Sequence, residues 1–288
     1  IMATLLSKAW TIYLSSNTRG FVYIKLDTSE RHINNLLLSR SIKGRLRRWT
    51  LTHIVDLVSV ETQRIYCQIR ENWGYLERKL IYLPNGIQTH KTGNARKEKV
   101  ILNVGRIGAY EKATDLLLRA LSKCRLNGWT MYFVGPIEDQ FHQQITAWFN
   151  ENPHLKDQVI FRGAVWDRRI LQQYYEKAAV FCLPSRWENF SFALLEAASA
   201  GCLLITTPVG VAKELIDITK YGMLFNVDDE DGLANCLDQV ISSWKFDPGE
   251  VNAAQEKIDA LFDWDKIIEV LDKNIVKTMM KKGHLNAN

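Results

Sequence analysis

The chain has 288 residues, of which 47% are hydrophobic and 24% charged, as expected for a globular protein of one large or two ordinary domains. No run of about 18 consecutive apolar residues occurs, so the sequence predicts no membrane-spanning helix. The net charge of +5 is uneven: residues 1–99 hold 17 Lys and Arg against 7 Asp and Glu, whereas residues 100–288 hold 20 against 25. The basic part favours an anionic partner, such as a membrane surface or a phosphorylated acceptor, and no nucleic-acid-binding motif is present.

The ends and the cysteines indicate a cytoplasmic protein. The opening residues lack the features of a secretory signal, and a chain that begins with Ile1 is expected to be a fragment. The five cysteines are widely spaced and lie mostly in apolar runs, as reduced core residues do. The six histidines form no zinc-binding pattern.

Residues 1–85 are expected to form part of an α/β domain. Helices are predicted at about 30–48 and 61–72. The turn-forming segment Leu83–Gly86 marks the end of this domain. The strands predicted here are Phe21–Leu26, Asp56–Val60 and Leu80–Leu83.

From about residue 99, short apolar runs alternate regularly with helical segments. This alternation predicts βαβ units and a parallel sheet covered on both faces. A helical tail from Asn252 to Lys282 is expected to break near Phe262. The predicted strands are Val100–Val104, Trp129–Val134, Val159–Phe161, Ala179–Leu183, Cys202–Thr206 and Met223–Phe225. The predicted helices are Thr114–Cys124, Gln140–Asn150, Asp167–Lys177, Phe190–Ala200, Ala212–Ile216 and Gly232–Ser243.

The densest group of candidate functional residues is Pro184–Gly201, which follows a predicted strand and opens a helix. Asn189 or Ser191 is suited to cap that helix, and free N–H groups at a helix start bind anions. The helical neighbours of Glu196 are small or apolar, so its carboxylate needs a hydrogen-bonding partner. The hydroxyls of a ribose would supply one, and the backbone N–H groups of a neighbouring loop are the alternative.

A second group follows the strand that ends at Val104. Gly105 allows the backbone to approach a ligand closely, Arg106 offers a fork for phosphate oxygens, and Lys112 offers a mobile point charge. A plain β–α turn is the alternative explanation. The segment is neither a dinucleotide fingerprint nor a P-loop.

Together these motifs resemble the GT-B retaining glycosyltransferases of glycosyltransferase family 4, which includes many bacterial polysaccharide and lipopolysaccharide enzymes. The resemblance covers about residues 55–270. It implies a GT-B type α/β fold with a partial Rossmann-like acceptor-side domain at 1–85. A Rossmann-like, doubly wound parallel sheet at 86–262 would bind the donor, and a C-terminal helix at 263–288 would return toward the first domain. The motifs, in order, are Leu83–Ile87, Val104-Gly105-Arg106 with Lys112, Phe161-Arg162-Gly163, Pro184-Ser185, and Glu188 with Glu196.

The resemblance also implies roles for the charged residues. Arg106 and Lys112 resemble the pair that holds the donor diphosphate and stabilises it as a leaving group. Glu188 resembles the glutamate that contacts the donor sugar near the reacting centre, and Glu196 resembles the one that binds the ribose hydroxyls. The Arg/Lys pair makes a bridging metal unnecessary, so no metal and no cofactor is expected besides the nucleotide-sugar substrate.

Backbone groups complete the implied donor site. The amides of Asn189, Phe190 and Ser191 would reach the diphosphate, where Gly105 allows close approach. The segment after Gly163 would line the base. Electrostatic stabilisation of the departing diphosphate would then be the main catalytic contribution, worth about 3–4 kcal/mol per well-placed donor.

Three positions depart from the family pattern. The usual Glu-Gly-Phe-Gly is Glu188-Asn189-Phe190-Ser191, the usual Lys-Gly is Lys112-Ala113, and the usual Gly-Gly of the next loop is Gly210-Val211. None removes a charged group, so donor binding is expected to survive, whereas the donor preference need not be the usual one.

The N-terminal part departs further. Family members have a glycine-rich loop near the start of a full N-terminal domain and a histidine that approaches the donor sugar. Here that domain is expected to begin partway through. His32 and His53 match no such site and are interpreted as surface or packing residues.

Two other signals have simpler explanations. Asp229–Asp231 and Asp263–Asp265 both spell D-x-D, but the first is a polar turn before a helix and the second a helix junction. A basic, partly apolar run could contact an anionic membrane, and a solvated basic face is the alternative. Gly44 disfavours one continuous helix through this run. The run comprises Leu36–Leu38, Arg40, Lys43, Arg45, Leu46, Arg47, Arg48 and Trp49.

The leading hypothesis is a retaining glycosyltransferase that moves a sugar from a nucleotide-diphosphate donor to a glycan or lipid-linked acceptor in polysaccharide biosynthesis. It would act in the cytoplasm, at the inner face of the membrane. The alternative is a truncated, non-catalytic nucleotide-sugar-binding fragment or half of a split enzyme. A dinucleotide-dependent oxidoreductase is disfavoured by the absent glycine fingerprint.

Overall fold

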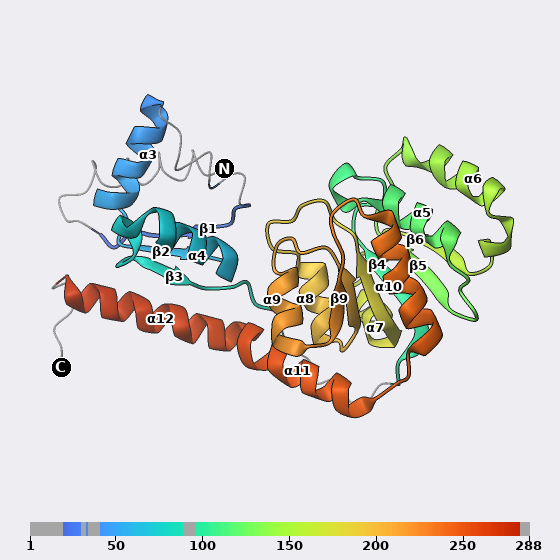
Figure 1. The fold of residues 1–288 in the computed structure, drawn as a ribbon. Helices are drawn as coiled ribbons and strands as arrows, with labels where there is room; N and C mark the ends of the chain where they lie inside the picture. Colours follow the sequence, from blue (N-terminus) through green and yellow to red (C-terminus); the bar gives the residue numbers. More distant parts are fainter. Residues whose placement is uncertain (1–19, 30–32, 34–40, 89–95, 283–288) are drawn as a thin grey trace. The chain divides into compact units, whose positions relative to one another are not determined.

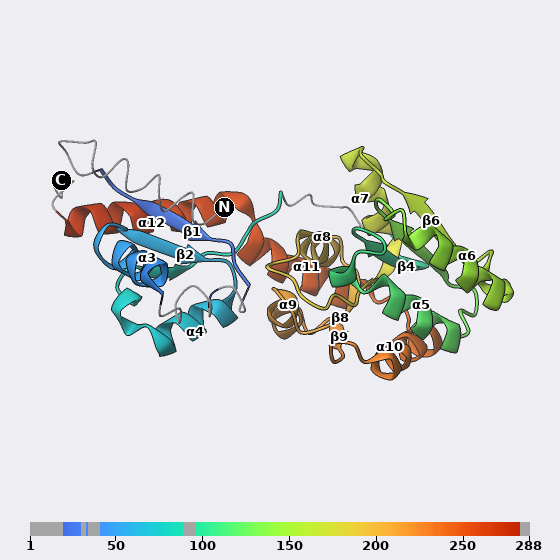
Figure 2. The same ribbon diagram turned by 90° about the horizontal axis from the view of Figure 1, so that it is seen from above.

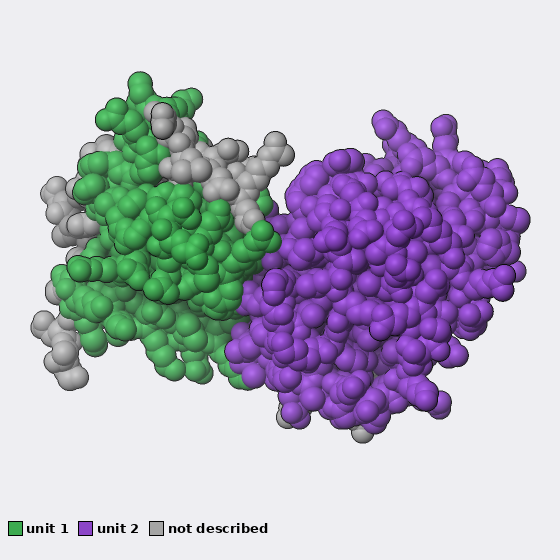
Figure 3. All heavy atoms as spheres, in the orientation of Figure 1, with its two compact units in different colours: residues 1–86, 264–288 green, residues 87–263 purple. Residues whose placement is uncertain are grey.

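The computed structural model describes residues 20–29, 33, 41–88 and 96–282 (Figure 1). Contacts within the chain define two compact units (Figure 3). Unit 1 comprises residues 1–86 and 264–288, and unit 2 comprises residues 87–263. The predictions that fall on His32, on Leu36–Leu38 and on Arg40 lie outside the described residues.

Unit 2 is built on a six-stranded sheet in which all pairings are parallel. The strand order is β6-β5-β4-β7-β8-β9. All six residues of β7 are buried, which explains why its sequence is apolar throughout rather than alternating. The strands are β4 (Glu98–Val104), β5 (Thr130–Val134), β6 (Val159–Gly163), β7 (Ala178–Leu183), β8 (Leu203–Thr206) and β9 (Gly222–Leu224).

Helices cover both faces of this sheet (Figures 1 and 2). One apolar core joins the sheet to α5 (Thr114–Lys123), α6 (Phe141–Glu151) and α10 (Glu230–Ser243). A second core joins it to the remaining helices of the unit. These are α7 (Arg168–Lys177), α8 (Phe192–Ser199), α9 (Ala212–Thr219) and α11 (Pro248–Phe262).

The order in which successive strands are added to the sheet reverses between β4 and β7. From β4 it moves outward through β5 and β6, and then returns to pair β7 against the other edge of β4. The Asn103 side chain joins the two strands, because its Nδ2 donates to the Cys182 carbonyl at 2.8 Å. Such a reversal leaves a crevice at the carboxyl ends of the strands, and ligands bind there in open α/β sheets.

Unit 1 contains a smaller parallel sheet of order β1-β2-β3. Its buried core includes Ile24, Val58 and Leu80 from the three strands, and Ile69 from α4. The elements are β1 (Tyr23–Leu26), α3 (Ile42–His53), β2 (Leu57–Val60), α4 (Gln63–Asn72), the short 3-10 helix η1 (Gly74–Leu76), β3 (Leu80–Tyr82) and α12 (Trp264–Lys281).

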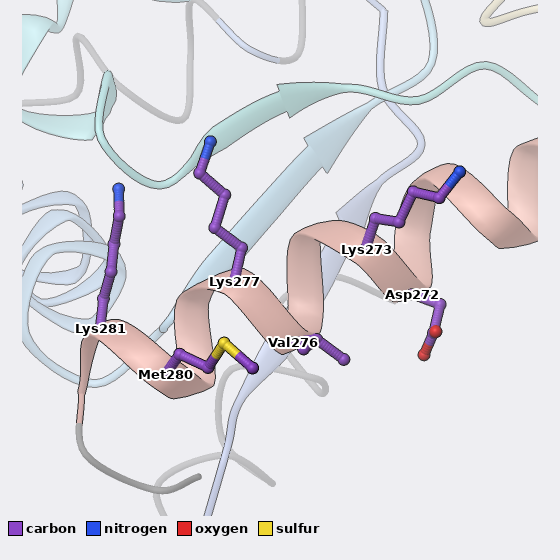
Figure 4. Close-up of a pocket in the computed structure, with 6 residues that line it drawn as sticks. All are labelled: Asp272, Lys273, Val276, Lys277, Met280 and Lys281. Carbon is purple, nitrogen blue, oxygen red and sulfur yellow. The ribbon is translucent and has the colours of Figure 1, made fainter. Parts of the chain in front are cut away.

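Helix α12 contacts the rest of unit 1 through charged groups. Lys282, just beyond it, forms an ion pair with the buried Asp56, and the Lys25 ammonium lies 5.9 Å from the centre of the Trp264 ring. A pocket of about 480 Å³ lies along the helix, where Lys273, Lys277 and Lys281 follow one another at four-residue spacing (Figure 4). Among the described residues, no helix combines the length and the apolar character needed to span a bilayer.

Gly44 does not interrupt the basic helix, contrary to the sequence-based expectation. It is the third residue of α3, and its N–H donates to the Oγ of the capping residue Ser41 at 3.1 Å. The first N–H groups of a helix have no helical partner, so this bond to the capping side chain satisfies the Gly44 N–H and supports the helix start. Helix α3 therefore runs without a break to His53.

Two other predicted element boundaries shift for local reasons. The predicted helix Phe190–Ala200 begins only at Phe192, because Ser191 takes the left-handed φ of +81° and the Phe190 carbonyl accepts a bond from Val211. The last helix of unit 2 begins earlier than Asn252, because Asp247 caps it and Pro248 occupies its first position.

Glu61 is a buried carboxyl in unit 1. Its Oε2 accepts a hydrogen bond from the Nδ2 of Asn85 at 2.7 Å. Burial, with the nearby Asp27 carboxylate as the next cause, raises the pKa of Glu61 from 4.5 to about 8. The folded protein thus holds this proton over a pH range in which the unfolded chain has already released it.

We expect Glu61→Gln to remove a pH dependence of stability. Between pH 4.5 and about 8 the unfolded state ionises first, so the wild-type free energy of unfolding falls as the pH rises. The variant stays neutral, so its stability relative to wild type should increase across this window and level off above it. Urea unfolding at several pH values measures the difference. The exposed Glu71→Gln on α4 is the control, and a difference independent of pH would contradict the expectation.

Candidate functional site

Two loops leave the sheet at the point of strand reversal. The loop after β4 runs from Gly105 to Ala113 and contains the short 3-10 helix η2 (Tyr110–Lys112). The loop after β7 runs from Pro184 to Ser191. Because β4 and β7 are parallel neighbours, their following loops lie at the same edge of the sheet.

The two loops meet through a charged contact. The Lys112 Nζ lies 2.5 Å from the Oε1 of Glu188, and the Ser185 Oγ donates to the same oxygen at 2.7 Å. The Glu188 side chain is only 11% exposed. Partly buried, charge-assisted contacts of this kind are short and strong, so they hold the two loops in a defined geometry.

The backbone beside Glu188 presents free donors. No described residue accepts a hydrogen bond from the amide N–H groups of Asn189, Phe190 or Ser191. The last of these takes a left-handed conformation at the start of α8, with φ +81°. Consecutive N–H groups around a left-handed residue at a helix start form a concave site for anions.

Gly210 is required by the close packing of this backbone. It has φ +57°, and a Cβ atom there would lie 2.7 Å from the Phe190 carbonyl oxygen and 2.9 Å from the Glu188 Cβ. The β8–α9 loop thus lies directly against the segment that carries the free amides. Any side chain at Gly210 would displace that segment.

Glu196 lies on α8 and is 16% exposed, which fits the expectation that this carboxylate is largely removed from water. Its partner is a residue that the sequence did not suggest. The Arg168 guanidinium, at the start of α7, contacts the Glu196 Oε1 at 2.7 Å. Burial, and next the Glu196 charge, raise the pKa of the neighbouring Tyr175 well above its usual value.

Arg106 points to a different set of partners from Lys112. Its guanidinium pairs with Glu111 and lies 3.8 Å from Glu138. The described contacts do not join Arg106 to Glu188. The structure therefore brings Lys112 and Glu188 together, and it leaves Arg106 and Glu196 in ion pairs of their own.

Arg186 is a second residue, after Arg168, whose role was not predicted from the sequence. Its guanidinium contacts both carboxylate oxygens of Asp115 at 3.0–3.1 Å, Asp228 at 2.6 Å and the Tyr110 carbonyl at 2.7 Å. Its backbone N–H donates to the Glu111 carbonyl at 2.8 Å. Burial would raise the pKa of Asp115, but the Arg186 and Arg119 contacts outweigh it and lower that pKa. Arg186 thus fixes the loop that carries Lys112, and no local pattern reveals contacts so distant in sequence.

The residues discounted from the sequence have structural contacts. His53 is exposed and stacks on Trp49, with 4.9 Å between ring centres. Asp229 caps α10 by accepting a bond from the Gly232 N–H at 2.8 Å, and Asp231 pairs with Lys123 at 2.6 Å. Asp263 follows the last residue of α11.

Residues 98–243 match the protein family described as Glycosyl transferases group 1, and the match covers just over half of the chain. The chain belongs to this family. The matched region contains both loops of the strand reversal.

Curated relatives agree with this assignment. The chain is 29% identical over 177 residues to an uncharacterized glycosyltransferase of Methanocaldococcus jannaschii, covering 59% of this chain and 43% of that protein. It is 27% identical over 219 residues to a Campylobacter jejuni enzyme, covering 74% and 58%. That enzyme is N-acetylgalactosamine-N,N'-diacetylbacillosaminyl-diphospho-undecaprenol 4-alpha-N-acetylgalactosaminyltransferase. The chain thus spans about half the length of these relatives.

A solved structure shows the same fold. Anabaena HepE in complex with UDP superposes with a TM-score of 0.75 at 17% sequence identity, covering 96% of this chain and 77% of that one. The likeness confirms the expected GT-B type of α/β fold.

We expect Ser191→Gly to stabilise the protein by about 1 kcal/mol. The substitution relieves left-handed strain of about 1–2 kcal/mol and removes a buried hydroxyl that has no hydrogen-bond partner among the described residues. Against this, glycine raises the entropy of the unfolded chain, which costs up to about 1 kcal/mol of stability. Urea unfolding measures the change. Ser191→Ala is the matched control, because it removes the hydroxyl and keeps the strain. A glycine variant less stable than the alanine variant would contradict the strain argument.

Proposed function

We propose that this chain carries the donor-binding machinery of a glycosyltransferase that moves a sugar, with retention at the anomeric carbon, from a nucleotide diphosphate to a glycan or glycolipid. Cell-surface polysaccharide biosynthesis, at the inner face of the cytoplasmic membrane, is the setting we propose for it. The observation that carries the proposal is the contact of Lys112 with Glu188 at the strand reversal, beside three free amides.

The charges of this site suit a departing diphosphate. Lys112 supplies a positive charge that can leave the Glu188 carboxylate and pair with a phosphate oxygen instead. The amides of Asn189–Ser191 supply hydrogen-bond donors held in place by the backbone. Arg106 would join them by giving up Glu138, its more distant partner at 3.8 Å. Released from Lys112, the Glu188 carboxylate would face the donor sugar. No step of this scheme requires a metal ion.

Glu196 is proposed to bind the ribose hydroxyls. Its carboxylate already accepts a charged hydrogen bond from Arg168, whose side chain is largely exposed and can move aside. The segment after Gly163 leads directly into α7 and is proposed to line the base. Exchange of Arg168 for ribose hydroxyls would keep the carboxylate paired throughout.

A nucleotide-sugar-binding fragment, or half of a split enzyme, is the second candidate. It is favoured by one observation: the chain spans about half the length of the relatives that it matches. Both candidates need the same donor site, so they differ in turnover and not in donor binding.

An anionic membrane surface is proposed as a further partner, through α3. The helix exposes Ile42, Leu46 and Trp49 along one stripe, at positions four and three residues apart. Lys43 and Arg45 are also exposed, and the helix contains no Asp or Glu. An apolar stripe flanked by cations matches the surface of an anionic bilayer, where lipid-linked acceptors are found.

The donor site is tested with nucleotide sugars. Thermal unfolding of the full chain is followed with UDP-glucose, UDP-N-acetylglucosamine, GDP-mannose and ADP-glucose. A ligand present at about one hundred times its dissociation constant should stabilise the fold by about 2.7 kcal/mol. Glu196→Gln should abolish most of that shift, because it removes the charged acceptor for the ribose hydroxyls. EDTA should leave the shift unchanged.

Glu151→Gln, exposed at the end of α6, is the control and should keep the full shift. Nucleotide release measured on the same samples separates the two candidates, since a shift without turnover in the presence of glycan acceptors favours the binding fragment. If no donor shifts the unfolding temperature, both candidates are wrong.

The membrane contact is tested by sedimentation with vesicles at low salt. We expect binding to vesicles that contain phosphatidylglycerol and none to pure phosphatidylcholine. Arg45→Ala should weaken binding about fivefold, since one cation near the surface contributes about 1 kcal/mol. Lys156→Ala, exposed in unit 2, is the control. Equal binding to both kinds of vesicle would exclude an electrostatic membrane contact.

A further inference from the structure

A polar pocket in unit 2 opens beside the loop that carries Lys112. Its volume is about 460 Å³, and its walls come from the loop after β4 and from the loop and first turns after β5. The two loops are joined by backbone hydrogen bonds, from the Ile107 N–H to the Pro136 carbonyl at 2.8 Å and from the Glu138 N–H to the Ile107 carbonyl at 2.9 Å. The walls of the pocket are therefore fixed relative to each other.

The charged wall of this pocket is acidic. Glu111, Glu138 and Asp139 line it against a single guanidinium, that of Arg106, which pairs with the first two. The excess of carboxylates repels an anionic ligand. A neutral ligand rich in hydroxyls fits better, because carboxylates accept hydrogen bonds from hydroxyls, and the amide of Gln144 both donates and accepts.

Two exposed aromatic rings extend the pocket on one side. Tyr110 lines the pocket and is 66% exposed, and Trp187 beside it is 49% exposed, with 5.6 Å between ring centres. The Arg186 guanidinium lies 4.3 Å from the centre of the Tyr110 ring and holds it from one side. Exposed aromatic rings next to a polar pocket are typical of a binding surface, because they offer large contact areas at little cost in conformational entropy.

We propose that the pocket and the Tyr110–Trp187 rings form a subsite for a pyranose ring of a neutral glycan acceptor. A pyranose has hydroxyls around its edge and an apolar C–H face, which match the polar wall and the aromatic rings respectively. The rings also adjoin the proposed donor site along the chain, since Tyr110 is two residues before Lys112 and Trp187 directly precedes Glu188. The inference rests on the proposed function, because it supplies the acceptor of that same transfer.

The subsite is tested by saturation-transfer NMR of the full chain with neutral trisaccharides: maltotriose, cellotriose and chitotriose. At least one should bind. Trp187→Ala should weaken that binding about tenfold, which corresponds to about 1.4 kcal/mol, within the range of an aromatic contact and its buried area. Trp187→Phe should restore most of the binding, because it keeps an aromatic ring. Tyr110→Ala should weaken binding to a similar extent.

Leu261→Ala is the control, since Leu261 is another exposed apolar residue of unit 2 that does not line the pocket. It should leave the trisaccharide signal unchanged. Trigalacturonate, an anionic sugar of the same length, should bind more weakly than the neutral trisaccharides because of the acidic wall.

Several outcomes would overturn the proposal. The proposal fails if Trp187→Ala reduces no trisaccharide signal, if Leu261→Ala causes an equal loss, or if trigalacturonate binds more tightly than the neutral trisaccharides. Displacement of the trisaccharide by a nucleotide sugar, but not by UDP, GDP or ADP alone, would assign the subsite to the donor sugar instead. Thermal unfolding with nucleotide sugars, measured on the same preparations, distinguishes a wrong subsite from a wrong function. If a nucleotide sugar raises the unfolding temperature but no trisaccharide binds, only the subsite is overturned. If neither effect is seen, the proposed function is overturned as well.

Discussion

The reversal of strand order between β4 and β7 is the constraint on which the site depends. In a parallel sheet, the loops that follow the strands all lie at the same edge. Where the strand order reverses, two neighbouring loops turn toward opposite faces of the sheet, and a ligand can bind in the crevice between them. Here those loops bring together Lys112 and Glu188, which are 76 residues apart in sequence. The hydrogen bond from Asn103 to the Cys182 carbonyl holds β4 and β7 together, and the contacts of Arg186 hold the loops that follow these strands. The charged contact is therefore a product of topology, held in place by buried polar bonds.

The departures from the family pattern preserve the backbone at a cost in strain. Ala113 and Ser191 stand where the family has glycine, and both adopt left-handed conformations, with φ of +51° and +81°. Glycine adopts such conformations freely, whereas other residues pay about 1–2 kcal/mol. The path of the chain around the free amides is thus retained while the side chains differ. The Ser191 hydroxyl is buried within this path, and the described residues offer it no hydrogen-bond partner.

The sequence was sufficient for the sheet of unit 2 and insufficient for the partners of its charged groups. All six strands were predicted, because fully buried parallel strands are continuous apolar runs such as Ala178–Leu183. The removal of Glu196 from water also followed from its helical neighbours. Its pairing with Arg168, and the direction of Arg106 toward Glu111 and Glu138, depend on where separate elements pack, which periodicity does not encode. The late start of α8 has the same origin, because the Phe190 carbonyl bonds to a loop from beyond β8.

The division of the chain has a consequence for the order in which the protein can be completed during synthesis. Unit 2 is one continuous segment, residues 87–263, whereas unit 1 combines residues that precede this segment with α12, which follows it. The ribosome synthesises α12 only after all of unit 2, so the Lys282–Asp56 ion pair cannot form until residues 87–263 have been made. The sheet of unit 1 is therefore synthesised before unit 2 but acquires its last contacts after it, because Asp56 meets Lys282 from 226 residues further along the chain.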